Sequence, residues 1–200
     1  MRLLHTADWH LGEHRKQIMQ RPIVGQEMVD ALVEKHNAVV APDDHVYIIG
    51  DAICQHAPHF LPQAARFNGR KTLLKGNHDR PFKNEDLALY FDEIIEEGVG
   101  VEVDFGGIAC YLVHYPTCGR ADRFNLVGHV HGAWKFQLNA LNVGVDTNHF
   151  APYDAEEIPF LFNAIKYYDE DIWAAYHESN SPFVGVRGKK GRYFNNEPGT

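Results

Sequence analysis

Short strand-type runs alternate with amphipathic segments in the first part of the chain, and this alternation limits the folds that it can adopt. Residues 2–7, 45–49 and 71–75 are strand-type runs, and each is followed by a glycine or a polar turn. Between them, residues 23–40 and 59–67 carry apolar side chains at helical spacing. A strand–helix–strand–helix–strand order predicts a layered α/β domain with a largely parallel sheet.

The pattern changes after about residue 93. Short strand-type runs follow one another with Gly or Asn turns between them, over residues 99–105, 108–113, 124–130, 133–138 and 141–145. Such a series is typical of antiparallel hairpins, so we expect a second sheet packed on the first.

Composition places the chain among folded proteins. A chain of 200 residues can bury roughly 70% of its unfolded surface in one domain. Hydrophobic residues at 44% and charged residues at 23% exclude disorder, collagen-like sequence and a coiled coil for the whole chain. The formal net charge of -8 argues against a protein that holds long nucleic acids by phosphate neutralisation alone.

Several classes are excluded by what the sequence lacks. No apolar run approaches the ~20 residues of a membrane helix, and the N-terminus lacks a signal-peptide pattern, so we expect a cytoplasmic protein without membrane contact. The 3 cysteines show no CxxC spacing, which is not the pattern of a disulfide framework or a zinc ribbon. The 13 histidines, in contrast, are many for this length, and histidine is the commonest metal ligand.

Metal-binding residue types recur where predicted strands end. These positions are Asp8 with His10, Asp51, Asn77 with His78 and Asp79, His114, and His129 with His131. In an extended chain residues i and i+2 point to the same side, so the Asp-x-His and His-x-His pairs can each chelate an ion. Carboxylate, imidazole and amide ligands together suit manganese, iron, zinc or nickel. We therefore predict a two-metal hydrolase site.

The ordered set of motifs DxH, GD, GNHD, H and GHxH resembles the calcineurin-like metallophosphoesterase superfamily over roughly residues 1–150. The resemblance implies a four-layer α/β/β/α sandwich with two packed mixed sheets. It also implies two divalent ions, manganese first, with iron, zinc, nickel or magnesium as alternatives. Two such ions can activate a hydroxide between them and clamp the phosphate oxygens during in-line attack.

Ligand roles follow from the same resemblance. One metal would be held by Asp8, His10, Asp51 and His131, and the other by Asp51, Asn77, His114 and His129, so that Asp51 bridges both. His78 would not bind metal but would stabilise or protonate the departing oxygen, and Asp79 would either orient its ring or serve as a helix N-cap. Substrate contacts are expected from Arg80, His14 and His56.

Three functions remain open at this point. The small size and the residue 46–51 and 114–116 segments resemble bacterial and phage phosphoesterases, which implies a phosphodiesterase or phosphatase for a small or single-stranded phosphoester. The first alternative is a nuclease on DNA or RNA, because residues 1–12 are very similar to the start of the SbcD type of DNA repair nuclease. The second alternative is a non-catalytic protein-interaction scaffold, as the retromer subunit of this fold is thought to be. Against it, every expected ligand position is filled.

We divide the chain into a core at residues 1–152 and an extension at residues 153–200. The extension contains a predicted helix over residues 155–168 and many aromatic residues, which we expect to pack on the core or on a second copy of the chain. Its last part is a Gly- and Pro-rich basic tail. The chain is expected to be a monomer or a homodimer.

Overall fold

The structure, a computed structural model, describes residues 1–16 and 20–166. Its first sheet has the order β10-β1-β2-β3-β4. The strands are β1 (Leu3–Thr6), β2 (His45–Ile49), β3 (Arg70–Leu74), β4 (Glu93–Ile95) and β10 (Tyr153–Asp154). The first four are parallel, as the alternating pattern predicted, and β10 runs antiparallel beside β1.

The second sheet has the order β5-β6-β7-β9-β8. It consists of β5 (Val101–Phe105), β6 (Ile108–Val113), β7 (Phe124–Val127), β8 (Phe136–Gln137) and β9 (Ala140–Asn142). The antiparallel pairing that we expected holds for β5 with β6 and for β8 with β9. It is wrong for β6 with β7 and for β7 with β9, which are parallel. The chain crosses back between these strands, so β6 and β7 end at the same edge of the sheet.

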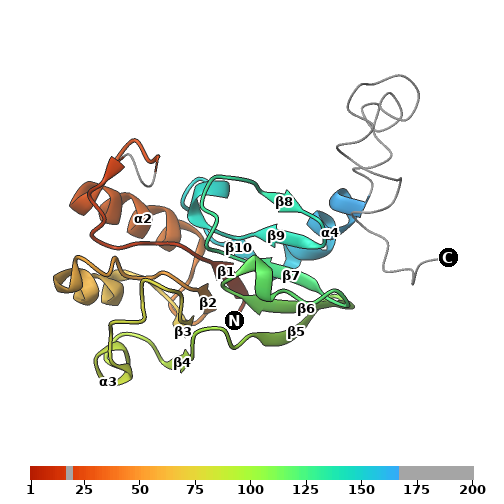
Figure 1. The fold of residues 1–200 in the computed structure, drawn as a ribbon, viewed down its shortest axis with the longest axis horizontal. Helices are drawn as coiled ribbons and strands as arrows, with labels where there is room; N and C mark the ends of the chain where they lie inside the picture. The colour runs from red at the N-terminus through yellow and green to blue at the C-terminus, as the bar shows by residue number, and fades with distance from the viewer. Residues whose placement is uncertain (17–19, 167–200) are drawn as a thin grey trace.

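Helices are few and most are short. Figure 1 shows α2 (Gly25–Val39) and the 3-10 helix η1 (Pro58–Arg66) on the side of the first sheet away from the second sheet. The remaining segments are α3 (Asn84–Leu87), η2 (Pro116–Cys118), η3 (Val145–Thr147), η4 (Ala155–Glu157) and α4 (Ile158–Lys166). The segment η1 is not α-helical, and Pro62 inside it has no N–H to donate to an α-helical ladder.

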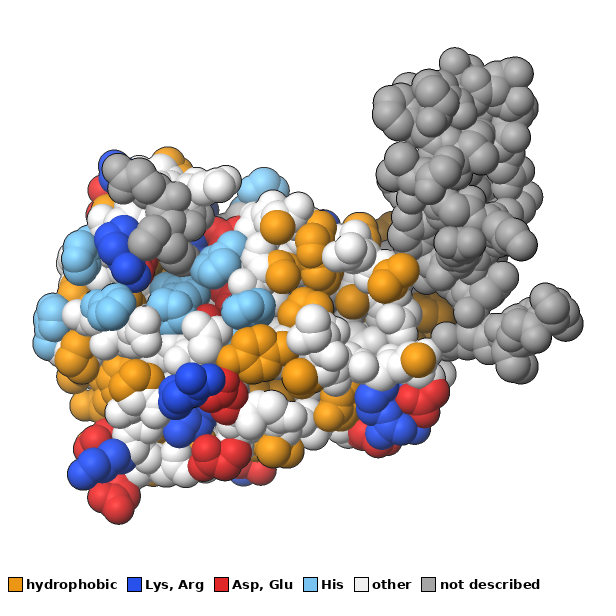
Figure 2. All heavy atoms as spheres, viewed as in Figure 1, with side chains coloured by type: hydrophobic (Ala, Val, Ile, Leu, Met, Phe, Trp, Pro, Cys, Tyr) orange, Lys and Arg blue, Asp and Glu red, His pale blue; other side chains and the backbone are white. Residues whose placement is uncertain are grey.

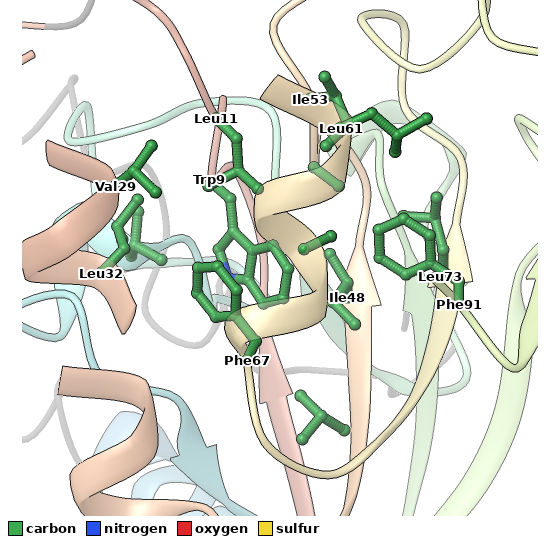
Figure 3. Packing of buried hydrophobic residues seen from close by; sticks show 14 of the residues in the cluster. Trp9, Leu11, Val29, Leu32, Ile48, Ile53, Leu61, Phe67, Leu73 and Phe91 are labelled. Carbon is green, nitrogen blue, oxygen red and sulfur yellow. The ribbon is translucent and has the colours of Figure 1, made fainter. Parts of the chain in front are cut away.

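Two hydrophobic clusters hold these layers together. In the cluster between α2, η1 and the first sheet, the indole of Trp9 stacks on the ring of Phe67 with a centroid distance of 4.1 Å, and Leu32 and Ile48 lie around them (Figure 3). The second cluster fills the space between the sheets, and it joins side chains such as Leu74 and Leu126. The α/β class and the two packed mixed sheets are thereby confirmed.

Residues 153–166, the described part of the extension, pack on the core. Strand β10 completes the first sheet, and the side chains of Tyr153 and Ile158 are buried in the cluster between the sheets. Phe162 of α4 packs edge-on against Phe124, with ring centroids 5.2 Å apart. Phe160 of α4 is exposed, and the predicted basic tail and the aromatic residues after residue 166 lie outside the described residues. None of the described helices is long and apolar enough to cross a membrane.

One buried histidine belongs to the core and not to the metal site. His5 of β1 is completely buried, stacked parallel to Tyr47 and edge-on to Phe105. Neither ring nitrogen has a hydrogen-bond partner among the described residues. Burial lowers the pKa of His5 to about 3, because the charged imidazolium is costly in an apolar environment.

This burial makes stability depend on pH. Below its unfolded pKa of 6.5 the His5 imidazole takes up a proton only in the unfolded chain, so the free energy of unfolding should fall by about 1.4 kcal/mol per pH unit until about pH 3. Urea unfolding at pH 6.5 and pH 5 should show about 2 kcal/mol of destabilisation from this residue. His5→Phe should remove that part of the pH dependence, and the exposed control His59→Phe should retain it. Equal pH dependence in both variants would contradict the assignment.

Candidate metal centre

The carboxyl ends of strands from both sheets meet at one place. Because β1, β2 and β3 are parallel, the residues that follow them lie along one edge of the first sheet. Parallel β6 and β7 bring the residues that follow them to the facing edge of the second sheet. An isolated bridge between Ala7 and Gly144 joins the chain after β1 to the chain after β9. The predicted ligands are therefore gathered by the topology.

Within residues 1–16 and 20–166, three groups of side chains lie close enough together to hold a metal ion. Within each group the candidate ligand atoms are all within 4.8 Å of one another, and the groups are Asp8, His10 and His131; His10, Asp51 and His78; and Asp51, His114 and His129. The first and third groups each contain three of the four residues in one of the two ligand sets that the family resemblance implied, and the ligand roles stay a prediction. Figure 2 shows histidine side chains gathered on the part of the surface where α2 and η1 lie in Figure 1.

The ligand-bearing backbone is strained. Asp8, His10, Asp51, His129 and His131 have φ angles of 59°, 48°, 53°, 73° and 50°, in the left-handed region that residues with a Cβ rarely adopt. Such conformations cost of order 1–3 kcal/mol each and cluster at functional sites. The strain turns each side chain toward a common centre instead of along its strand.

Two glycines leave the space that this convergence requires. A Cβ atom at Gly50, where φ is 85°, would overlap the imidazole of His114. A Cβ atom at Gly76 would overlap the carboxylate of Asp51 and lie 2.8 Å from Nε2 of His114. Glycine at these two positions therefore allows the side chains of His114 and Asp51 to approach the backbone closely.

Asp51 is at the centre of the cluster. Its Oδ1 accepts a hydrogen bond of 2.8 Å from the backbone N–H of His78. Its Oδ2 lies 3.5 Å from Nε2 of His10 and 3.4 Å from Nε2 of His114, between the two predicted ligand sets. This position suits a carboxylate that bridges two cations.

The second ligand set is oriented by neighbouring groups. Nδ1 of His114 lies 2.9 Å from the carbonyl oxygen of Ile49, so this nitrogen is the donor and Nε2 is left to bind metal. The Oδ1 atom of Asn77 lies 3.4 Å from Nε2 of His114 and 3.1 Å from Nδ1 of His129. An amide oxygen and two imidazoles are thus directed at one point.

Unpartnered polar atoms show that the residues fit metal ions. Among the described residues, ten buried side-chain nitrogen or oxygen atoms lack a hydrogen-bond partner, and six belong to this cluster: Oδ2 of Asp8, both ring nitrogens of His10, Oδ2 of Asp51, Nδ1 of His78 and Nδ1 of His131. Buried polar atoms are rarely left unpaired without a reason. Divalent cations would satisfy the carboxylate oxygens of Asp8 and Asp51 and one ring nitrogen each of His10 and His131.

Electrostatics at the centre also favour cation binding. Burial raises the pKa of Asp8 to about 6 and lowers the pKa of His10 far below its usual range. Burial opposes the charged forms of Asp51 and His114, but their mutual attraction prevails, so the pKa of Asp51 is lowered and that of His114 is raised to about 9. A metal ion would take the place of the proton on His114.

Two residues behind the ligands were not predicted for this role. Asp146 accepts hydrogen bonds of 2.7 and 2.8 Å from the guanidinium of Arg21, and its Oδ2 lies 3.6 Å from Nδ1 of His131. Arg21 also donates to the backbone carbonyls of Asp8 and Trp9 at 2.6 and 3.1 Å. The pair therefore ties the Asp8 loop to His131. The pairing spans 125 residues of sequence, so no local motif could have indicated it.

The structure assigns His78 and Asp79 different surroundings. The half-buried His78 ring lies edge-on to the buried His10 ring, with centroids 4.5 Å apart. Asp79 is fully buried, and its carboxylate accepts bonds from the backbone N–H groups of Gly76, Ala52 and Ile53 at 3.0 to 3.3 Å. It makes no hydrogen bond to the His78 ring in the described part of the chain. The expectation that Asp79 orients His78 is therefore corrected: this carboxylate joins the loops after β2 and β3, and burial raises its pKa to about 7.

The predicted substrate contacts have partners within the protein. The guanidinium of Arg80 forms a two-pronged ion pair with Glu97, at 2.6 and 2.8 Å. His14 and His56 are exposed on the loops after β1 and β2, and their ring nitrogens lie near Gly12 and Gln55. Contact of these three residues with a substrate stays a prediction.

Comparisons with known proteins support the fold. No model of a protein family matches the chain, and no curated protein matches it. Among solved structures, the fold is similar to AQ665, a protein of unknown function from Aquifex aeolicus, with a TM-score of 0.61 and 23% identity over 80% of this chain and 98% of that one. An archaeal phosphodiesterase also matches, at a TM-score of 0.42 and 14% identity over 72% of this chain and 82% of that one.

The position of Asp51 between the two ligand sets predicts a large effect of its removal. Asp51→Asn should lose more bound metal than His131→Ala, because a bridging carboxylate neutralises both cations whereas His131 is a ligand in one set only. Metal content is measured by elemental analysis after loading with manganese and desalting. Two metals per chain in Asp51→Asn would contradict the shared-ligand assignment.

The Arg21–Asp146 pair predicts an effect on affinity without loss of a ligand. Asp146→Asn should weaken metal binding by about 10- to 100-fold, because the amide neither matches the charge of Arg21 nor holds His131 as strongly. A competition titration with a chelator measures this. Asp122→Asn, an exposed carboxylate paired with Arg120 and Arg123, serves as the control. Equal affinities in both variants would show that Asp146 does not support the centre.

Proposed function

We propose that this protein is a metal-dependent phosphoesterase that hydrolyses a small or single-stranded phosphodiester or phosphomonoester. The observation that carries the proposal is the pair of ligand groups on either side of one buried carboxylate, Asp51. Two sets of mixed carboxylate, imidazole and amide ligands that share one residue are typical of two-metal hydrolases. The fold and the order of the motifs agree with this assignment.

The residues that would hold the ions are those of the two ligand sets. Asp8, His10 and His131 would hold one cation, Asn77, His114 and His129 the other, and Asp51 would contribute to both. When bound, the two cations supply Lewis acidity toward the phosphoryl group and lower the pKa of water to near neutrality.

The arginines near the metal centre are paired with carboxylates, so the negative charge of a substrate phosphate would be balanced by the cations. Within the described residues, Arg15 pairs with Glu13, Arg21 with Asp146, and Arg80 with Glu97. A substrate phosphate would therefore find no unpaired guanidinium among these three, which makes bound metal the main source of positive charge.

His78 is the residue best placed to act on the leaving group. Its backbone N–H holds Asp51, and its half-buried ring lies beside that of His10. Burial lowers the pKa of its imidazole, so the ring is neutral near neutral pH and can donate a hydrogen bond through its ring N–H. We assign it the hydrogen bond or proton to the departing oxygen.

The test is hydrolysis of bis-p-nitrophenyl phosphate and p-nitrophenyl phosphate by protein that was stripped with a chelator and reloaded with manganese, magnesium, zinc or nickel. Hydrolysis should depend on added metal and should be abolished in Asp51→Asn. A single-stranded oligonucleotide, tested in parallel, distinguishes the nuclease alternative. Metal binding without turnover of any ester would overturn the proposal in favour of a non-catalytic scaffold.

The role of His78 can be separated from metal binding. His78→Ala should keep its metal content but should slow esters with poor leaving groups by roughly 10²- to 10⁴-fold, and nitrophenyl esters by less. The exposed His59→Ala is the matched control and should not change either rate. Loss of metal in His78→Ala would instead make His78 a ligand, as its proximity to His10 and Asp51 allows.

A further inference from the structure

A cavity adjoins the metal centre on the side of His131. Its volume is about 580 Å³, within the range of small-molecule sites, and its walls come from the loops around residues 20–22, 130–133 and 145–150. His131 lies in the wall of this cavity and also in the first ligand group. A group attached to a phosphate at the metal centre would therefore extend into this space.

Two consecutive aromatic residues of the wall are held in strained conformations. His149 and Phe150 have φ angles of 52° and 69°, which are rare for side chains of this size. The turn is fixed because the N–H of Phe150 donates to the carbonyl oxygen of Val145 at 2.9 Å and the N–H of Ala151 to that of Asn148 at 2.9 Å. Backbone strain that the surrounding structure enforces is characteristic of functional positions. We therefore consider these two rings as candidate ligand contacts.

The charges of the wall exclude a second anionic group. Arg21 is the one Lys or Arg among the described wall residues, and its guanidinium is already bound to Asp146 and to the backbone of Asp8 and Trp9. The same guanidinium lies 5.7 Å from the ring centroid of Phe150, so a cation–π interaction holds this ring in place. The rest of the wall is mixed: it has the rings of His149 and Phe150 and apolar side chains such as Val130, beside the polar side chains of Gln20, His131 and Asp146.

We infer that this cavity receives the base of a nucleoside phosphoester, stacked on Phe150, while the phosphate occupies the metal centre. A planar, uncharged ring fits an aromatic wall without an unpaired cation, whereas a further phosphate would meet Asp146 and no free positive charge. The exposed imidazole of His149 offers a hydrogen bond to the edge of the base. This inference rests on the proposed function and names its substrate class.

The experiment is calorimetric titration of the manganese-loaded protein with adenosine 5′-monophosphate and with ribose 5-phosphate, which carries the same phosphate without a base. The nucleotide should bind about 5- to 150-fold more tightly, the fold-change expected of one base–aromatic stacking contact. Phe150→Ala should reduce nucleotide affinity to that of ribose 5-phosphate and leave ribose 5-phosphate unchanged. Phe160→Ala, an exposed phenylalanine of α4, is the matched control.

A second variant keeps the test independent of the folding of Phe150→Ala. Ala133 is an exposed wall residue, so Ala133→Trp should fill the cavity and weaken nucleotide binding without weakening ribose 5-phosphate binding. Equal affinity of the wild-type protein for both ligands, together with hydrolysis of nitrophenyl esters, would overturn this inference and leave the proposed function intact. Discrimination by the base without hydrolysis of any ester would support the cavity assignment and overturn the proposed function.

Discussion

A carboxylate without enough hydrogen bonds to balance its burial is the constraint on which the rest of the site depends. Asp51 is 1% exposed, one of its oxygens accepts from the backbone of His78, and the other faces His10 and His114 without a hydrogen bond. An isolated buried charge is costly, and removal of one partner from such a group leaves the other uncompensated. The loops that surround Asp51 are therefore arranged around its charge, with Gly76 approaching closely and His114 turned toward it.

The strained backbone conformations persist here because pairing and packing of the sheets hold the flanking strands in place. The left-handed residues Asp8 and Asp51 follow β1 and β2, which are buried and paired on both sides. Their backbones are also joined directly, since the N–H of Asp8 donates to the carbonyl oxygen of Gly50 and the N–H of His10 to that of Asp51. The apolar clusters on both faces of the first sheet provide the stabilisation that offsets the strain.

At the metal centre the cations and the protein would have different roles. Positive charge for the phosphate would come from the cations, because the neighbouring guanidiniums are bound to carboxylates of the protein itself. The Arg21–Asp146 pair supports His131 on one side and forms part of the cavity wall on the other. One ion pair thereby links ligand geometry with the shape and charge of the space in which the rest of a substrate would lie.

The sequence by itself determined the α/β class, the parallel strands β1, β2 and β3, and the set of residues that the fold brings together. These features follow from local periodicity and from motifs of adjacent residues. Only the tertiary structure decided the parallel pairing of β6, β7 and β9, the binding of Asp79 to three backbone N–H groups, and the Arg21–Asp146 pair. It also decided that the strained rings of His149 and Phe150 line a cavity beside His131. Each of these features depends on contacts between segments far apart in the chain, and the energy of such contacts is not encoded in the pattern of any one segment.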